Sequence, residues 1–136
     1  GIDTRYLALA LGHVRAPPRV DLPVAHHPGD RRRMVAGDRE GARAATTEIL
    51  SSEPRALPGL PPPGDVSLVE VRARAARRHQ VRVHLATLGH PLLGDTLYGG
   101  PELDGPGHRL HASRLSFAHP ETGAPVDVRS TPRGWP

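Results

Sequence analysis

The sequence predicts a mainly β protein with a single short helix, and three observations lead to this prediction. Residues 66–74 alternate between apolar and charged side chains, as a half-buried strand does. Two further apolar runs, Tyr6 to His13 and Leu110 to Ala118, also favour strands, although the Leu and Ala of the first would equally allow a helix. Only residues 81–88 repeat their apolar side chains at the spacing of a helix.

The strand predicted at residues 66–74 has one apolar and one charged face. Side chains of alternate residues point to opposite sides of a strand. The apolar face carries Val69, Val71 and Ala73, and the charged face carries Glu70, Arg72 and Arg74. We therefore expect the first set to face the core.

Proline and glycine interrupt the chain between these elements. Residues 14–41 are polar and are expected to form a loop, or a two-stranded flap or arm. Thr46 to Leu50 predicts a weaker strand, and residues 54–65 predict a Pro/Gly-rich linker loop on the surface with few packing contacts. Residues 120–123 form a turn that leads the last predicted strand, residues 126–128, back along the preceding one.

The helix has a buried stripe and a clear stop signal. Val81, Leu85 and Leu88 recur at i, i+4 and i+7, so they share one side of a helix. Gly89 suits the left-handed position that ends a helix, and Pro91 prevents the helix from continuing.

Arg82 lies on the flank of this stripe and not opposite it. Its guanidinium is therefore expected at the border between the core and a cleft. A charge in that position needs an anionic partner. Taken alone, an arginine on a helix is more often a solvated side chain.

Composition limits the classes of protein to which the chain can belong. Its 136 residues allow one domain at most, with a core made of Val, Leu and Ala because only 3% of the residues are aromatic. Cysteine is absent, so disulfides and thiolate metal sites are excluded. There is no run of apolar residues long enough to cross a bilayer and no signal peptide pattern. The expectation is a soluble cytoplasmic protein without a membrane partner.

All 18 basic side chains are arginines, and the formal net charge is +4. Arginine forms forked hydrogen bonds with phosphate and stacks on bases, so clustered arginines suit RNA. Arg31 to Arg33 are consecutive, and five more arginines crowd residues 72–82. The codon usage of a GC-rich genome explains most of the absence of lysine, but not this clustering.

The nine histidines raise the question of a metal site. His79 and His84 are five residues apart, which misses the i, i+4 spacing that places two imidazoles on one side of a helix. No glutamate accompanies them in a metal-binding motif. We therefore expect no metal ion.

Several motifs in order resemble one family of enzymes. Residues 76–84, with Arg77, His79, Gln80, Arg82 and His84, match a family motif except that Ala76 replaces a glycine and Arg78 a threonine. Further likenesses are Tyr6 to Leu9, with Thr4 in place of a lysine, the arm-like residues 21–24 and 30–34, and the residues 110–112 and 115–123. Together they resemble the RluA-like RNA pseudouridine synthases of the large ribosomal and transfer RNA family.

This resemblance implies an α+β fold, a mixed and mainly antiparallel sheet with few helices, of which residues 1–136 supply the later part as a partial catalytic domain. It implies isomerisation of uridine to pseudouridine in structured ribosomal or transfer RNA, without a cofactor. In that reaction Tyr6 faces a flipped uridine as a stacking partner or general base, and Arg82 pairs with a catalytic aspartate. The RNA-binding candidates are Arg31, Arg32, Arg33, Arg77, Arg78, His79 and Gln80.

The catalytic aspartate that the family places before its tyrosine motif has no match within these 136 residues. The nearest likeness, Leu103-Asp104-Gly105, lacks the preceding arginine. The expectation is thus a C-terminal fragment that is inactive alone, its sheet completed by a missing N-terminal segment or a partner chain. The alternative is a non-catalytic RNA-binding or vestigial fragment. Tyr6 could instead be a core aromatic, the arginine run a solvated turn, and Asp95 and Tyr98 residues that fix the turn after the helix.

Overall fold

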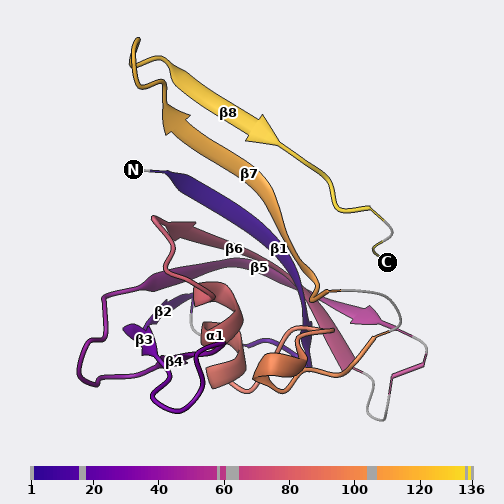
Figure 1. Ribbon diagram of the computed structural model, residues 1–136. Helices are drawn as coiled ribbons and strands as arrows, with labels where there is room; N and C mark the ends of the chain where they lie inside the picture. Colours follow the sequence, from indigo (N-terminus) through magenta and orange to yellow (C-terminus); the bar gives the residue numbers. More distant parts are fainter. Residues whose placement is uncertain are drawn as a thin grey trace.

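A six-stranded sheet forms the framework of the computed structural model, which describes residues 2–15, 18–57, 59–60, 65–103, 107–133 and 135 (Figure 1). In spatial order the strands are β2 (Arg19–Asp21), β5 (Thr46–Ala56), β6 (Asp65–Arg74), β1 (Asp3–Leu11), β7 (Leu110–Ala118) and β8 (Pro125–Arg129). Every pair of neighbours in this sheet is antiparallel. The predicted α+β class with a mainly antiparallel sheet is confirmed.

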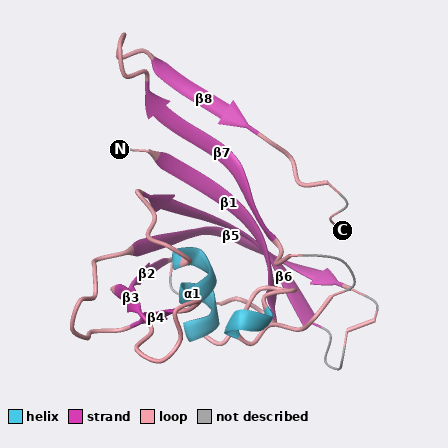
Figure 2. Ribbon diagram, viewed as in Figure 1, coloured by secondary structure: helices cyan, strands magenta, loops and turns pink. Residues whose placement is uncertain are grey.

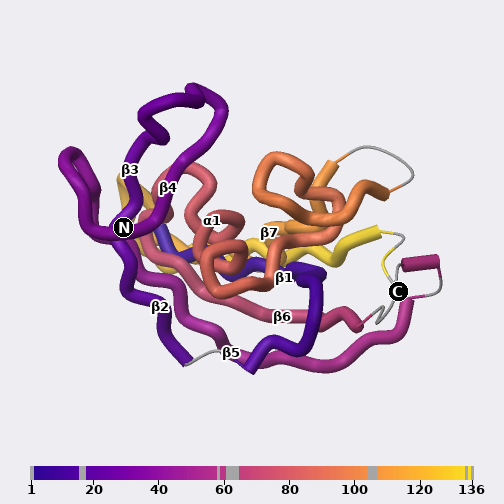
Figure 3. Tube along the Cα trace, turned by 90° about the horizontal axis from the view of Figure 1, so that it is seen from below, coloured from indigo at the N-terminus to yellow at the C-terminus, as the bar shows by residue number. Residues whose placement is uncertain are grey.

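One side of the sheet is covered by the helix α1 (Gln80–Thr87), with the short 3-10 turn η1 (Thr96–Tyr98) beyond it (Figure 2). On the same side, β3 (Val24–His26) and β4 (Met34–Ala36) form a separate two-stranded sheet that packs on α1 (Figure 3). Of the alternatives expected for residues 14–41, a loop or a two-stranded flap or arm, this part of the chain has the two-stranded form, and we call residues 24–36 the flap. In contrast, β2 lies outside the flap and pairs with β5 in the main sheet.

The core lies between the sheet and α1. Val69 and Val71 of β6 are fully buried and pack with Val81 and Leu85 of α1, as the alternation predicted. Tyr6 of β1 is half-buried against the same cluster. Burying each such Val or Leu side chain contributes about 1.5–3 kcal/mol to folding.

The helix ends as the sequence predicts. The N–H of His90 donates to the carbonyl of Leu85 at 2.8 Å, and the N–H of Gly89 donates to that of Ala86 at 3.0 Å. Gly89 has a φ of 90°, which completes a Schellman motif. The carbonyls of Leu85 and Ala86 in the last turn are satisfied in this way.

A second side of α1 is also buried, which the single apolar stripe did not predict. Val83 packs with Val24 and Met34 of the flap, and His84 has no exposed surface. The hydroxyl of Thr47 donates to Nδ1 of His84 at 2.7 Å, because Nε2 must donate to the carbonyl of Leu22 at 2.8 Å. The flap converts a helix that the sequence shows as half-buried into one enclosed on two sides.

The prediction of a loop over residues 54–65 is partly wrong. Strand β5 continues to Ala56, and Pro54 lies within it, opposite Ser67. Since β2 pairs only with residues 46–48, the rest of β5 is a sheet edge. A proline is tolerated there because no neighbouring strand needs a hydrogen bond from its backbone nitrogen. Leu57 and Leu60 then pack against an apolar cluster, while Pro58 and residues 61–64 lie outside the described part.

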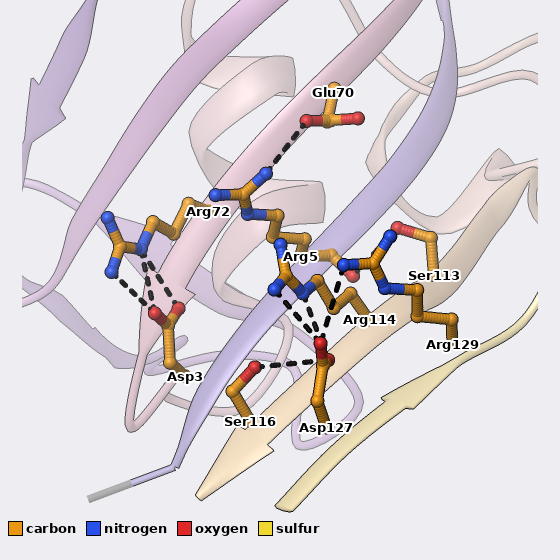
Figure 4. A network of polar contacts seen from close by, with 9 residues as sticks. All are labelled: Asp3, Arg5, Glu70, Arg72, Ser113, Arg114, Ser116, Asp127 and Arg129. Atoms are coloured by element: carbon orange, nitrogen blue, oxygen red, sulfur yellow. Dashed lines mark hydrogen bonds and ion pairs between the residues drawn. The ribbon is translucent and has the colours of Figure 1, made fainter. Parts of the chain in front are cut away.

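The face of the sheet turned away from α1 carries a row of four arginines, Arg72, Arg5, Arg114 and Arg129, aligned across β6, β1, β7 and β8 (Figure 4). We call this set the arginine row. Each member has a carboxylate partner: Asp3 for Arg72, Glu70 for Arg5 at 3.6 Å, and Asp127 for both Arg114 at 3.0 Å and Arg129 at 3.4 Å. The like charges of the row are thus interleaved with acids.

Among the helices that the structure describes, none has the length and apolar character needed to cross a membrane.

Candidate functional site

Tyr6 and Arg82, which lie far apart in the sequence, line one pocket of about 200 Å³. The pocket lies where β1, the N-terminal end of α1 and the start of β7 meet. Its lining residues are Tyr6, Ala76, Arg77, His79, Gln80, Val81, Arg82, His108 and Leu110. We call it the Tyr6–Arg82 pocket.

Arg82 is held by a buried aspartate of the same chain. Its Nε donates to Oδ2 of Asp95 at 2.9 Å, and its Nη2 donates to Oδ1 at 2.8 Å. The side chain of Arg82 is 12% exposed and that of Asp95 only 1%. This bond raises the pKa of Arg82, so the guanidinium remains charged.

Asp95 is therefore the anionic partner that the position of Arg82 required, and the sequence pattern did not reveal the pair. The fork uses only two of the three guanidinium nitrogens. Nη1 makes no hydrogen bond to any residue that the structure describes, and Arg82 lines the pocket. One edge of the guanidinium is thus anchored, and the other is free to bind an anion.

Tyr98 connects Arg82 to the flap. Its hydroxyl accepts the N–H of Met34 at 2.8 Å and is hydrogen-bonded to Nδ1 of His79 at 2.8 Å. The guanidinium carbons of Arg82 and Arg33 lie 5.1 and 5.7 Å from the centre of its ring. These distances are typical of cation–π contacts.

The expected role of Asp95 in the turn after the helix is confirmed, because its carbonyl accepts the N–H groups of Tyr98 and Gly100 at 3.2 and 2.8 Å. Asp95 and Tyr98 lie in one tight turn, and both of their side chains contact Arg82. This shared turn is the sequence signal that could have revealed Asp95 as the partner of Arg82.

The loop that leads from β6 into α1 is strained and firmly held. Ala75 and His79 have φ values of 47° and 57°, in the left-handed region that side chains disfavour. Oε1 of Gln80 accepts the N–H of Arg77 at 2.9 Å, and its Nε2 donates to the carbonyl of Thr46 at 2.8 Å. Gln80 is buried, so it fixes the position of Arg77 from within the fold.

Two histidines of the pocket are neutral hydrogen-bonding groups near pH 7. Burial lowers the pKa of His79, and the positive charges of Arg82 and Arg78 lower it further. Burial and the charge of Arg82 likewise lower the pKa of His108. Arg82 therefore carries a permanent positive charge in the pocket, whereas His79 and His108 do not.

The three flap arginines differ in position. Arg33 lies over Tyr98, next to the pocket, and its Nε is buried without a hydrogen-bond partner among the described residues. Arg32 is paired with Asp30 at 3.1 Å, which lowers the pKa of that carboxyl to about 2. Arg31 is exposed. The structure thus brings Arg33 to the site, and Arg31 and Arg32 remain on the outer turn of the flap.

Over the residues described, no three histidine, aspartate or glutamate side chains gather closely enough to hold a metal ion.

Known proteins share both the sequence and the fold. The ribosomal large subunit pseudouridine synthase D of Zymomonas mobilis is 35% identical over 93% of this chain and 40% of its own length. An uncharacterized RNA pseudouridine synthase of Synechocystis is 41% identical over 76% of this chain and 31% of its own length. No family model matches the chain.

Among solved structures, the human RNA pseudouridylate synthase domain containing 1 is 28% identical, with a TM-score of 0.78 over 96% of this chain and 55% of that one. A second human protein, domain containing 4, shares the fold with a TM-score of 0.66 at 22% identity.

The chain is thus similar in both sequence and fold to the class of RNA pseudouridine synthases. Within that class the chain is similar to the RluA-like synthases, as its motifs indicated. The chain corresponds to a C-terminal portion of these relatives and spans about 40% of the length of the Zymomonas mobilis protein.

Proposed function

We propose that the Tyr6–Arg82 pocket binds a flipped uridine in an RNA pseudouridine synthase that acts on ribosomal or transfer RNA. The observation that carries this proposal is the guanidinium of Arg82, anchored by Asp95 on one edge and free on the other, in a pocket that also contains Tyr6. The catalytic carboxylate is an aspartate outside these 136 residues.

The pocket suits a single base. Its volume of about 200 Å³ is below the roughly 300–1,000 Å³ of typical ligand pockets. A base inside a duplex or a folded RNA has to leave its stack before an enzyme can reach its glycosidic bond. Tyr6 offers an aromatic surface to stack on the base, and neutral His79 and His108 can form hydrogen bonds with its polar edge.

The reaction detaches uracil from C1′ of the ribose, rotates it and rejoins it through C5, so one glycosidic bond breaks and one carbon–carbon bond forms. A carboxylate that assists this exchange must remain ionised inside a closed pocket. A fixed guanidinium favours that charged form. Arg82 supplies it in a defined orientation because Asp95 holds the opposite edge.

The arginines around the pocket would hold the RNA backbone. Arg77 and Arg78 are exposed on the loop before α1, and Arg33 lies on the flap beside Tyr98. Arg31 and Arg32, farther out on the flap, would make weaker contacts. His79 and Gln80 contribute by shaping the loop, since Gln80 is buried and its amide is bonded within the fold.

The rest of the protein, or a partner chain, would cover the β7–β8 hairpin. Leu115, Phe117, Val126 and Val128 face the same side of the sheet as Tyr6, because they are paired in register with one another and with Thr4. They belong to none of the three core clusters, and Val128 is 52% exposed. A partner would complete both this apolar face and the sheet edge.

A second candidate function is RNA binding without catalysis. The lining residues of the Tyr6–Arg82 pocket include no carboxylate, and the nearby carboxylate of Asp95 is paired with Arg82. The pocket therefore has no free carboxylate of its own for catalysis, which favours this second function. A fragment of this kind would bind the same RNA and leave it unchanged.

Pseudouridine formation in uridine-containing RNA separates the two functions. We expect no product with the 136-residue chain alone, and product with a longer form that includes the family's aspartate motif. In that longer form Arg82→Lys, which keeps the charge but loses the fork, should lower turnover strongly while RNA affinity stays near normal. Near-normal turnover would remove Arg82 from the site, and product from the 136 residues alone would refute the need for an outside aspartate.

A further inference from the structure

A second pocket, of about 400 Å³, adjoins the first and is rich in arginine. It opens at the start of β5 and the end of β6, against the loop of residues 75–79. Its lining residues are Arg19, Ala44, Ala45, Thr46, Glu48, Arg74, Ala75, Arg77 and Gln80. We call it the rim pocket. Arg77 and Gln80 line both pockets, so only the strained loop separates them.

The arginines of the rim pocket differ from those of the arginine row. Arg74 and Arg77 form no ion pair within 4.0 Å over the residues described, whereas every arginine of the row has a carboxylate. Asp3, whose pKa the charge of Arg74 helps to lower, is hydrogen-bonded to Arg72 and not to Arg74. Two positive charges of the rim pocket are thus available to a ligand.

The rim pocket is also pre-organised. The backbone of Arg77 is fixed by the buried amide of Gln80, and its Nε donates to the carbonyl of Ala44 at 3.3 Å. Arg19 stands at the outer edge and is paired with Asp21 at 2.9 Å. Glu48 is the one carboxylate in the lining, and its charge also acts on Arg72 across the strand pair. The balance of charge remains positive.

We propose that the rim pocket binds a phosphodiester group of the RNA, next to the nucleotide whose base occupies the Tyr6–Arg82 pocket. Arg74 and Arg77 bind the phosphate oxygens. Guanidinium groups match phosphate geometry, and neither Arg74 nor Arg77 is paired with a carboxylate among the described residues. This inference rests on the proposed function, since the RNA strand would cross the loop of residues 75–79 from one pocket to the other.

The test compares Arg74→Ala with Arg129→Ala in the full chain. Both variants remove one exposed arginine, but Arg129 lies in the arginine row and has its own carboxylate. With a single-stranded RNA that contains one uridine, we expect Arg74→Ala to weaken binding about fivefold and to reduce the slope of log K against log salt by about 0.7. Arg129→Ala should change neither, and Arg74→Lys should restore the slope.

A neutral methylphosphonate, moved one linkage at a time along the same RNA, locates the contact. At one linkage beside the uridine it should weaken binding to the wild type and have no further effect on Arg74→Ala. Equal losses in Arg74→Ala and Arg129→Ala, or a methylphosphonate effect that persists unchanged in Arg74→Ala, would overturn the phosphate site.

Two NMR observations keep this inference separate from the proposed function. Inorganic phosphate should shift the Nε–H signals of Arg74 and Arg77 and not that of Arg129. An absence of these shifts overturns the rim pocket as an anion site. RNA that binds without shifting the signals of Tyr6 and Arg82 overturns the proposed function instead.

Discussion

Two arginine–aspartate pairs of the same geometry lie on opposite sides of the sheet. Arg82 and Asp95 form a forked pair at 2.8 and 2.9 Å, and Arg114 and Asp127 form one at 3.0 Å on both arms. In each pair the partners are 13 residues apart in the sequence. The first pair is 12% and 1% exposed, and the second is 33% and 38% exposed.

This comparison shows that burial, and not bond length, decides what such a pair does. Water screens an exposed pair and solvates either partner when the other is removed, so the arginine row contributes little to stability. A buried partner that loses its counter-ion cannot be solvated, and the fold then carries the full penalty. Arg82 is therefore held rigidly within the fold, whereas the row forms a charged, solvated surface.

The largest expected difference between the two pairs is in stability. Asp95→Ala should lower the free energy of unfolding by about 3–5 kcal/mol, because Arg82 remains buried without its counter-ion. Asp127→Ala, the matched change on the other side, should leave the midpoint of urea unfolding within error of the wild type. Similar midpoints for both variants would show that burial does not separate the pairs.

Next in size is the effect of the Tyr98 hydroxyl. Tyr98→Phe should lower stability by about 1–3 kcal/mol, since the buried N–H of Met34 and the Nδ1 of His79 both lose a partner. Hydrogen exchange at the Met34 amide should accelerate. Tyr6→Phe is the control, because the Tyr6 hydroxyl makes no hydrogen bond within the described ranges. Unchanged exchange at Met34 in Tyr98→Phe would mean that the flap is held in another way.

A smaller change in stability should follow from a change in pH. It arises only from histidines on the side of the sheet that α1 covers. The pKa values of His79, His84 and His108 are lowered, mainly by burial, from 6.5. Below about pH 6.5 the unfolded chain therefore binds more protons than the folded chain, so stability is complete above that pH and declines as the pH falls.

Urea unfolding between about pH 7.5 and pH 5 measures this decline. His84→Gln should make it less steep, because Gln cannot take up the proton. Stability that rises on acidification, or a slope that His84→Gln leaves unchanged, would contradict the assignment of neutral buried histidines.

The smallest effects are expected in the arginine row. Arg5→Gln and Arg114→Gln should change neither the midpoint of unfolding nor RNA binding, because their acids remain solvated. Salt titrations of RNA affinity should give the wild-type slope for both variants. A reduced slope would place the RNA on this face as well.

Local patterns in the sequence were sufficient for the framework. Alternation identified β6 and its buried face, and Gly89 with Pro91 marked the end of α1. The motifs led to Tyr6 and Arg82, which the fold brings to one pocket. These features depend on neighbours along the chain.

Contacts between distant segments could not be read in the same way. Pro54 lies in a strand because β2 stops short and leaves an edge, and Val83 is buried because the flap packs on the helix. The partner of Arg82 was expected outside the chain, yet Asp95 also fills that role from within it. Each of these depends on where another part of the chain comes to lie.

The most direct test of the central claim is an NMR titration with a short single-stranded RNA that contains one uridine. The Nε–H signal of Arg82 and the ring signals of Tyr6 should shift together, and the signals of Arg114 and Arg129 should stay in place. Shifts confined to the arginine row, with Tyr6 and Arg82 unmoved, would contradict the account.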